Sequence, residues 1–258
     1  MKIAVYSGSF NPLHIGHLAI LEYLVNETDF DMVYLVVSPV NPFKEGKKQT
    51  SAEERVRLAK EAVQRHSATL AGADGVLKVK VEDIELSMPA PQYTRRTLDA
   101  LQTREPENDF TLVIGGDNLA AFTRWRDYDY IIERYGLAVY PREGYDIDKS
   151  LKIIQNSLNQ ISSSTCDESS KTPIDLSQKT TIDLSKKTPI DQSKKTTIDQ
   201  TKKTPIDLSK DQSKNKSKDR IFDLKERIQI ISAPEVTISS TDIREGLVNG
   251  NDMSQWLM

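Results

Sequence analysis

Residues 6–18 read Tyr6-Ser7-Gly8-Ser9-Phe10-Asn11-Pro12-Leu13-His14-Ile15-Gly16-His17-Leu18, and the organisation of the rest of the chain can be worked out from them. They follow a short apolar run, Ile3–Val5, and lead into an apolar stripe at helical spacing that ends near Glu27. This pattern predicts a buried strand that turns sharply into a helix. Gly8 allows the turn, and Gly16 omits a Cβ in the first helical turn, where another group must come close.

Two histidines in this stretch, His14 and His17, lie three residues apart, so both point the same way from the first turn of the predicted helix. That turn also offers unpaired N–H groups and the positive end of the helix dipole, which together suit a phosphate chain. Two other interpretations are a strand–helix corner with surface histidines and a zinc site. Zinc fits poorly, because it needs three or four ligands and the chain holds only three histidines and one cysteine.

Length and composition indicate the class of protein. The chain has 258 residues and a net charge of −3, so nothing draws it as a whole to nucleic acid or to a membrane. Its single cysteine, Cys166, excludes an intramolecular disulfide and fits a reducing compartment. No apolar run approaches the ~20 residues that span a bilayer, and the N-terminus does not read as a secretion signal. We therefore expect a cytoplasmic protein.

Apolar runs alternate with helical patterns along the first half of the chain. The predicted strands after the first are Met32–Val37, Val76–Leu86, Phe110–Ile114, Gly136–Tyr140 and, much later, Arg227–Ile231. The predicted helices after the first are Ser51–His66, Thr94–Leu101, a short piece after Gly116, and Trp125–Ile132. Strands that are apolar throughout, alternating with helices, predict an α/β fold with a doubly wound parallel sheet.

This pattern stops in the second half of the chain. Residues 171–210 contain five copies of an eight-residue unit, Lys-Thr-(Pro/Thr)-Ile-Asp-(Leu/Gln)-(Ser/Thr)-(Lys/Gln). Each copy carries too few apolar residues to offset the entropy of ordering it, so we expect disorder rather than a stacked solenoid. The predicted domains are a folded domain of residues 1–145 plus 226–258, a helical connector at 146–164, and a low-complexity repeat insertion at 165–219.

A cluster of hydroxyl residues near the end of the chain marks another helix start. Ser239, Ser240 and Thr241 precede an apolar pattern, and Arg244 falls in its first turn. The simple interpretation is a capped helix. The functional interpretation is a second phosphate seat, built from a helix N-terminus, hydroxyl groups and a forked cation.

The motifs resemble those of a known family. Gly8-Ser9-Phe10-Asn11-Pro12 followed by His14-x-Gly16-His17 looks like the signature of the HxGH nucleotidyltransferases, which move a nucleoside monophosphate from a triphosphate to a phosphate or alcohol acceptor. Three later patches, in order, narrow the resemblance to the bacterial nicotinate-nucleotide adenylyltransferases. These patches are Pro91-Gln92-Tyr93-Thr94-x-x-Thr97-Leu98, Ile114-Gly115-Gly116-Asp117 with Trp125, and Ile238-Ser239-Ser240-Thr241-x-Ile243-Arg244. The resemblance covers residues 1–145 and about 226–255, and it implies a Rossmann-like nucleotidyltransferase fold.

The resemblance also implies roles for individual residues. The groups expected to act on the phosphates in catalysis are His17, His14 and Arg244. The residues expected to bind ATP are Gly8, Ser9, Phe10, His14, Gly16, His17, Lys44, Asp117, Ser239, Ser240 and Arg244. The residues expected to bind nicotinate mononucleotide are Tyr93, Thr94, Trp125 and Arg142. Mg²⁺ would be bound mainly through the ATP phosphates.

The implied reaction is transfer of AMP from ATP to nicotinate mononucleotide, which gives nicotinate adenine dinucleotide and pyrophosphate in NAD biosynthesis. An alternative acceptor is nicotinamide mononucleotide or another phosphate. Pantetheine phosphate is disfavoured, because its enzymes usually carry threonine in place of His14. A non-catalytic nucleotide-binding protein is an alternative of another class, to which the lysine-rich repeat lends some support. A homo-oligomer is compatible with the sequence. Asn11 departs from the family pattern, since many relatives carry aspartate there.

Overall fold

The computed structural model describes residues 1–39, 50–164 and 224–258. The predictions for Lys44 and for the octapeptide repeat fall outside these ranges. The described residues belong to one compact unit, Met1–Thr165 together with Asp223–Met258.

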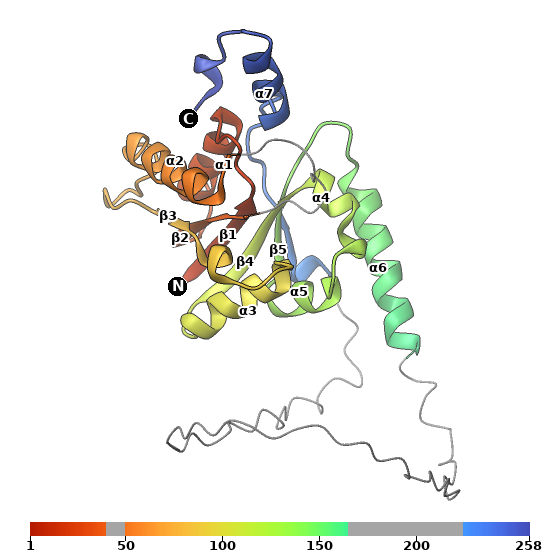
Figure 1. The fold of residues 1–258 in the computed structure, drawn as a ribbon. Helices are drawn as coiled ribbons and strands as arrows, with labels where there is room; N and C mark the ends of the chain where they lie inside the picture. The colour runs from red at the N-terminus through yellow and green to blue at the C-terminus, as the bar shows by residue number, and fades with distance from the viewer. Residues whose placement is uncertain (40–49, 165–223) are drawn as a thin grey trace, which may run out of the picture. The chain divides into compact units, whose positions relative to one another are not determined.

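Six strands of the described chain form one parallel sheet in the order β3-β2-β1-β4-β5-β6 (Figure 1). The strands are β1 (Lys2–Gly8), β2 (Met32–Val37), β3 (Val79–Glu82), β4 (Asp109–Gly115), β5 (Leu137–Tyr140) and β6 (Ile228–Ile230). The central strands are buried on both faces, as their continuous apolar sequences require. The predicted doubly wound α/β sheet is therefore confirmed.

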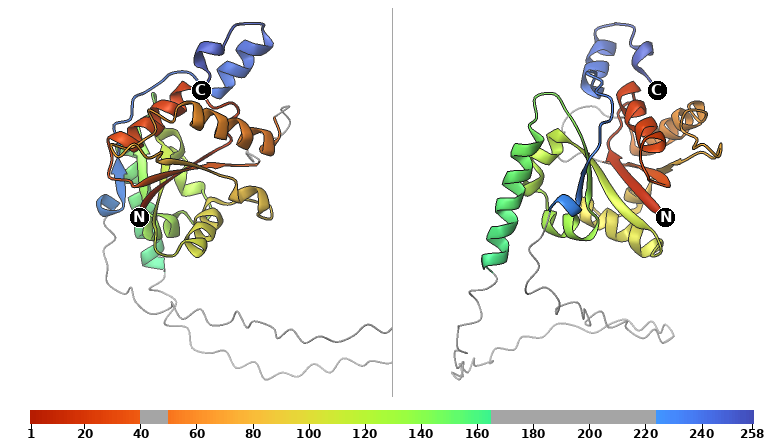
Figure 2. Two further views of the ribbon diagram at one scale, coloured as in Figure 1. Left: turned by 90° about the vertical axis from the view of Figure 1, so that its left-hand side faces the viewer. Right: turned by 180° about the vertical axis from the view of Figure 1, so that it is seen from behind.

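Helices cover both faces of this sheet. The α-helices are α1 (Ile15–Asn26), α2 (Ala52–Arg65), α3 (Thr94–Arg104), α4 (Gly116–Ala120), α5 (Tyr128–Arg134), α6 (Ile147–Ser164) and α7 (Ser240–Val248). The short 3₁₀ turns are η1 (Ile84–Ser87), η2 (Phe122–Arg124), η4 (Leu224–Glu226) and η5 (Ser254–Trp256). Right-handed crossovers place α1 and α2 on one face and α3 to α6 on the other (Figures 1 and 2).

The order of the strands creates a switch point in the middle of the sheet. From β1 the chain moves outward to β2 and β3, and it then returns to β4 and moves outward the other way to β5 and β6. The carboxyl ends of β1 and β4 therefore lie side by side with their following helices on opposite faces. In open α/β sheets, ligands bind in the crevice at this point.

Two predicted elements differ from the structure. The stretch Val76–Leu86 is a strand only at β3, because Asp83 leaves the extended conformation (φ −114°, ψ 16°) and η1 follows. Trp125 does not begin a helix: its backbone is extended at the end of η2. The helix α5 starts three residues later, after Asp127 adopts the left-handed conformation (φ 55°), which interrupts a helix.

Candidate functional site

The predicted strand–helix corner, residues 6–18, places His14 and His17 together. His14 is the N-cap of α1, and its Nδ1 accepts a hydrogen bond from the Gly16 N–H at 3.1 Å. The His14 N–H in turn donates to Nδ1 of His17 at 3.2 Å, so the two imidazoles form a reciprocal capping box. Their ring centroids are 3.8 Å apart. A Cβ on Gly16 would lie 3.0 Å from the His14 ring, which explains the glycine.

This hydrogen bonding fixes the protonation of both rings. Because each Nδ1 accepts a backbone hydrogen bond, the neutral imidazole carries its proton on Nε2. Burial and the positive charge of Arg142 lower the pKa of His14 to about 4, and burial with neighbouring His14 lowers the pKa of His17 well below its usual value. At neutral pH the corner therefore presents two neutral N–H donors rather than two cations.

The loop before α1 has an unusual backbone at Phe10, whose φ is 41°. The Phe10 side chain is buried and packs edge-on against Tyr6 and His17, with ring centroids 5.4 and 5.1 Å apart. The Phe10 ring also passes within 3.0 Å of the position that a Cβ on Gly8 would occupy. A side chain locked in this way holds the backbone of the loop in one conformation.

The second predicted seat, at the start of α7, meets the first. Ser239 caps α7 in a reciprocal pair with Asp242. The Ser240 hydroxyl donates to the Pro12 carbonyl at 3.0 Å, and the Arg244 guanidinium donates to the Asn11 carbonyl. Segments more than 220 residues apart in sequence therefore lie side by side at the carboxyl edge of the sheet, with α7 beside the N-terminus of α1 (Figures 1 and 2).

A buried arginine that sequence reasoning missed supports the same loop. Arg55, on α2, is 2% exposed and donates to the carbonyl groups of Ser9, Ser38 and Pro39. It stands four residues before Ala59 on the buried face of α2, where an apolar residue is expected. The sequence did contain a signal for this role: a charged residue at a position that the helical pattern assigns to the core. A charged group is buried only when it is hydrogen-bonded, so such a residue is expected to support nearby backbone carbonyl groups.

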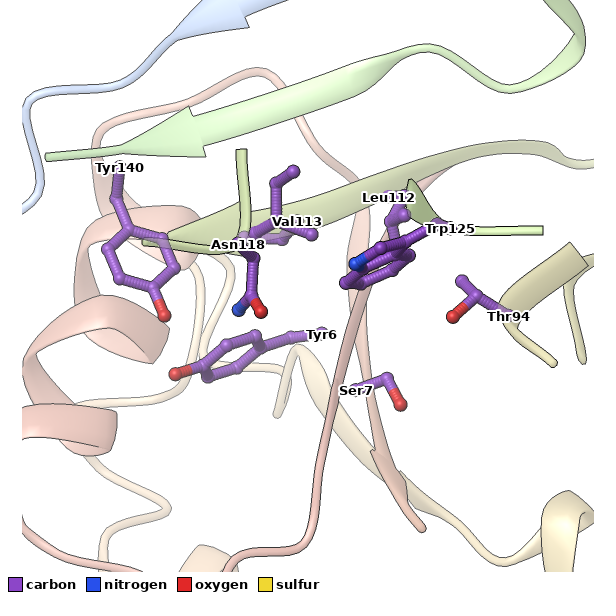
Figure 3. Close-up of a pocket in the computed structure, with 9 residues that line it drawn as sticks. Tyr6, Ser7, Thr94, Leu112, Val113, Asn118, Trp125 and Tyr140 are labelled. Atoms are coloured by element: carbon purple, nitrogen blue, oxygen red, sulfur yellow. The ribbon is translucent and has the colours of Figure 1, made fainter. Parts of the chain in front are cut away.

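A small cavity of about 60 Å³ opens at the switch point between β1 and β4 (Figure 3). Tyr6 and Ser7 line it from β1 and Thr94 from the start of α3. Trp125 and Tyr140 also line it, so two of the predicted pyridine-binding residues, Thr94 and Trp125, share one cavity. Sequence reasoning missed Tyr6, Ser7 and Tyr140. Their signal was their position, since all three lie at the carboxyl ends of central strands.

Tyr93 lies elsewhere. Its side chain is exposed and borders an open groove shared with Arg95, Arg126 and Asp127. The Arg126 guanidinium lies 5.1 Å from the centre of the Tyr93 ring. Tyr93 therefore does not line the small cavity with Thr94 and Trp125, and its predicted part in the pyridine pocket stays a prediction.

Asp117 and Arg142 lie beside the cavity, around Tyr140. Asp117 Oδ1 and Arg142 Nε are buried and have no hydrogen-bond partner among the described residues. The Arg142 guanidinium lies 5.5 Å from the centre of the Tyr140 ring. Burial raises the pKa of the Tyr6 and Tyr140 hydroxyls, and the pKa of Arg142 is raised by Tyr140 and Asp117 in opposition to its burial. Unpaired buried groups of both signs suit a polar ligand.

Among the described residues, no helix has the length and apolar character needed to cross a membrane. Within the same residues, no group of three or more His, Cys, Asp or Glu side chains could hold a metal ion.

The chain is similar in sequence to known proteins. The sequence profile of the family described as cytidylyltransferase-like matches residues 5–169. A Bacteroides fragilis protein named "probable nicotinate-nucleotide adenylyltransferase" is 36% identical over 173 residues, which are 65% of this chain and 81% of the relative. A Flavobacterium psychrophilum protein of the same name is 39% identical over 176 residues, which are 66% of this chain and 86% of the relative.

A solved structure shows the same fold. The nicotinic acid mononucleotide adenylyltransferase of Plasmodium falciparum, in complex with NaAD, superposes with a TM-score of 0.58 at 13% sequence identity. The superposition covers 99% of this chain and 90% of the other.

Proposed function

Because this chain belongs to the cytidylyltransferase-like family, and within it groups with the nicotinate-nucleotide adenylyltransferases, we propose that it transfers AMP from ATP to nicotinate mononucleotide at the carboxyl edge of its sheet. The products are nicotinate adenine dinucleotide and pyrophosphate, and the reaction belongs to NAD biosynthesis. The observation that carries the proposal is the contact between the loop before α1 and the start of α7, beside the cavity that holds Trp125.

The ATP phosphates bind between the two helix starts. The Nε2–H groups of His14 and His17 donate to phosphate oxygens, and the N–H groups of the Arg244 guanidinium not used by Asn11 and Thr241 do the same. The Phe10 N–H and the first turn of α1 add backbone donors. All these groups are held in place before ATP arrives, so little reorganisation is needed in the transition state.

The chemistry needs no nucleophile from the protein. The phosphate of nicotinate mononucleotide attacks the α-phosphorus of ATP, and pyrophosphate leaves from the opposite side. The chain holds the two nucleotides in line and stabilises the charge that spreads over the phosphate oxygens. His17 and Arg244 are the side chains to which we assign most of this stabilisation.

The nicotinate ring occupies the switch-point cavity. It stacks on Trp125, and Thr94, with the N-terminus of α3, receives its carboxylate. At about 60 Å³ the cavity is smaller than the ~300 Å³ at the lower end of ligand pockets, so its walls open when the ring enters. We assign Asp117 and Arg142 to the polar groups of the bound nucleotides, because both carry a buried unpaired atom.

Mg²⁺ fits this arrangement. In nucleotide sites Mg²⁺ is usually bound by substrate phosphates and by only one or two carboxylates of the protein. Asp117, which has a buried unpaired oxygen, would supply such a carboxylate. When bound, Mg²⁺ neutralises phosphate charge. The compartment that we propose is the cytoplasm, where a lone cysteine stays reduced.

One assay tests the proposal. The purified chain is given ATP with nicotinate mononucleotide or with its amide, and pyrophosphate release is followed. We expect release with the nicotinate form. Release with the amide alone would transfer the function to nicotinamide mononucleotide, and no release with either would contradict the proposal and favour a non-catalytic nucleotide-binding protein.

A further inference from the structure

The buried guanidinium of Arg55 brings a positive charge beneath the loop that precedes α1. Its hydrogen bonds within the described chain all go to backbone carbonyl groups, and none goes to a carboxylate. Nε donates to Thr50 at 3.2 Å, one terminal nitrogen donates to Ser9 and Ser38, and the other donates to Pro39 at 2.7 Å. Burial lowers the pKa of Arg55, yet an arginine keeps its proton in a protein. The cost of burying this charge is therefore offset by carbonyl groups of two loops at the carboxyl edge of the sheet.

One of these carbonyl groups belongs to the peptide unit that also carries the Phe10 N–H. The Ser9–Phe10 peptide bond is trans. In a planar trans peptide the C=O and N–H groups point in opposite directions. When Arg55 binds the Ser9 carbonyl, it therefore also fixes the direction of the Phe10 N–H, which points away from the guanidinium.

The backbone of Phe10 needs such support, because its φ of 41° lies in the left-handed region that a bulky residue rarely adopts. The other side of the residue is held by its ring, whose centroid lies 5.4 Å from that of Tyr6 and 5.1 Å from that of His17. His17 belongs to the first turn of α1. The Ser9–Phe10 peptide is thus fixed between Arg55 and the two-histidine corner.

The charge of Arg55 also acts on this N–H group. A cation that binds the carbonyl end of a peptide polarises it, and hydrogen-bonded groups in series strengthen one another in the protein interior. Arg55 itself is only 2% exposed, so its charge influences a ligand at the carboxyl edge through the peptide that it binds.

We propose that Arg55 is a positioning residue for ATP, which holds the Ser9–Phe10 peptide so that the Phe10 N–H donates to an oxygen of the α-phosphate. This inference rests on the proposed function, since ATP is the ligand concerned. Charge develops on the α-phosphate oxygens in the transition state, so a donor fixed there lowers the barrier more than it tightens the binding of ATP. Loss of Arg55 should therefore lower kcat more than it changes either KM.

Arg55→Lys tests this role, because lysine keeps the charge but lacks the fork that reaches several carbonyl groups at once. In this variant kcat should fall by about 10–100-fold, as a misplacement of about 1 Å allows, and both KM values should change far less.

A second readout uses the two diastereomers of ATPαS, which place sulfur at one or the other non-bridging oxygen of the α-phosphate. Sulfur accepts hydrogen bonds weakly, so the wild type should be slower with the diastereomer that puts sulfur opposite the Phe10 N–H. The ratio of the two kcat values should be several-fold smaller in Arg55→Lys, because both changes disturb one interaction.

Arg104→Lys is the matched control. Arg104 donates to both carboxylate oxygens of the buried Glu82, at 2.9 and 2.8 Å, and neither residue lines the cavity. This variant should lower the melting temperature and leave kcat and the ATPαS ratio unchanged.

A backbone change makes the test independent of the folding of Arg55→Lys. Phenyllactate in place of Phe10 replaces the N–H with an ester oxygen and leaves Arg55 in place, and it should give the same fall in kcat and the same smaller ratio. If the wild type is active, an unchanged ATPαS ratio in Arg55→Lys or in the ester chain would overturn the inference alone. An equal fall of kcat in Arg104→Lys would do the same. A wild-type chain that releases no pyrophosphate would overturn the proposed function and the inference with it.

Discussion

At the scale of single residues, the chemistry that we propose depends on which ring nitrogen of each of two histidines carries the proton. His14 and His17 each accept a backbone N–H at Nδ1, so each neutral ring donates from Nε2. The Nε2–H group of a neutral imidazole can donate to a phosphate oxygen at any pH above the pKa at which the ring becomes an imidazolium cation. The lowered pKa values extend that range well below neutrality.

The first prediction concerns His17. Replacing it with alanine removes a donor to the α-phosphate that matters most as charge develops, so kcat should fall on the order of 10²–10³-fold while both KM values change far less. Steady-state kinetics with ATP and nicotinate mononucleotide measure both effects. His66, the C-cap of α2, is the matched control, and His66→Ala should keep its kcat. Unchanged turnover in His17→Ala would refute the role.

The second prediction concerns pH. Because the folded pKa of His14 is lowered to about 4, the unfolded chain takes up the proton first as pH falls below 6.5, so the folded state loses stability from pH 6.5 down to about pH 4. His14→Gln keeps an acceptor for the Gly16 N–H and cannot titrate. Between these limits, the free energy of unfolding of the wild type should fall more steeply, by up to ~1.4 kcal/mol per pH unit. Parallel curves from urea unfolding would show that His14 titrates normally.

The sequence indicated these histidines but not their arrangement. Spacing placed both rings on one side of a helix start, yet capping depends on the backbone of His14 being extended, which spacing alone does not reveal. The burial of Arg55 and Glu85 was not predicted, for a related reason. Each is a charged residue buried by contacts with distant segments, and local pattern treats such residues as exposed.

At the scale of elements, α7 matters because it brings Arg244 to the loop before α1. The helix has only nine residues, so its cap contributes a large share of its stability. Its hydrogen bonds to Asn11 and Pro12 join the two helix starts that we propose as phosphate seats.

The third prediction tests this helix. Ser239→Ala removes the N-cap, should cost about 1 kcal/mol of stability, and should raise the KM for ATP because α7 frays where Arg244 lies. Asp146 serves as the control, since its Oδ1 accepts from the Lys149 N–H at 2.9 Å at the start of α6 and Asp146 does not line the cavity. Asp146→Ala should cost similar stability in thermal unfolding and leave the KM unchanged. Equal KM values for ATP in both variants would show that α7 does not position Arg244.

Elements were predicted well where the chain is buried and regular. The strand Met32–Val37 was predicted to the residue, because an apolar run covered on both faces has one interpretation. The strand predicted at Val76–Leu86 is longer than β3, because apolar and polar residues continue to alternate through the 3₁₀ turn η1. In that turn Glu85 is buried and accepts a hydrogen bond from Thr97. Trp125 was predicted to begin a helix, because the sequence gives no sign that Asp127 adopts the left-handed conformation and delays the helix to Tyr128.

At the scale of the whole molecule, the sheet order explains why distant motifs meet. β1 and β4 are neighbours, so the histidine loop after β1 and the Gly115-Gly116-Asp117 turn at the end of β4 open at the same edge. Alternation of strands and helices predicted this sheet. The contact of α7 with the loop before α1 could not be predicted, because it depends on tertiary packing across more than 220 residues.

The fourth prediction concerns the lysine-rich insertion, which we propose is dispensable. Replacing residues 165–218 with a short Gly/Ser linker should keep kcat and both KM values. Loop closure entropy changes slowly with length, so stability should change by only about 1 kcal/mol. Steady-state kinetics and thermal unfolding of the shortened chain test this. A large loss of activity in a chain that still unfolds cooperatively would give the insertion a function.

The central claim is that both helix starts bind one triphosphate beside the cavity that receives the acceptor. The most direct measurement is a crystal structure of the chain with a non-hydrolysable ATP analogue and nicotinate mononucleotide. We expect phosphate oxygens within about 3 Å of both His17 Nε2 and the Arg244 guanidinium, and the pyridine ring against Trp125. A triphosphate that contacts only one of the two helix starts, or a pyridine ring bound outside the switch-point cavity, would contradict the claim.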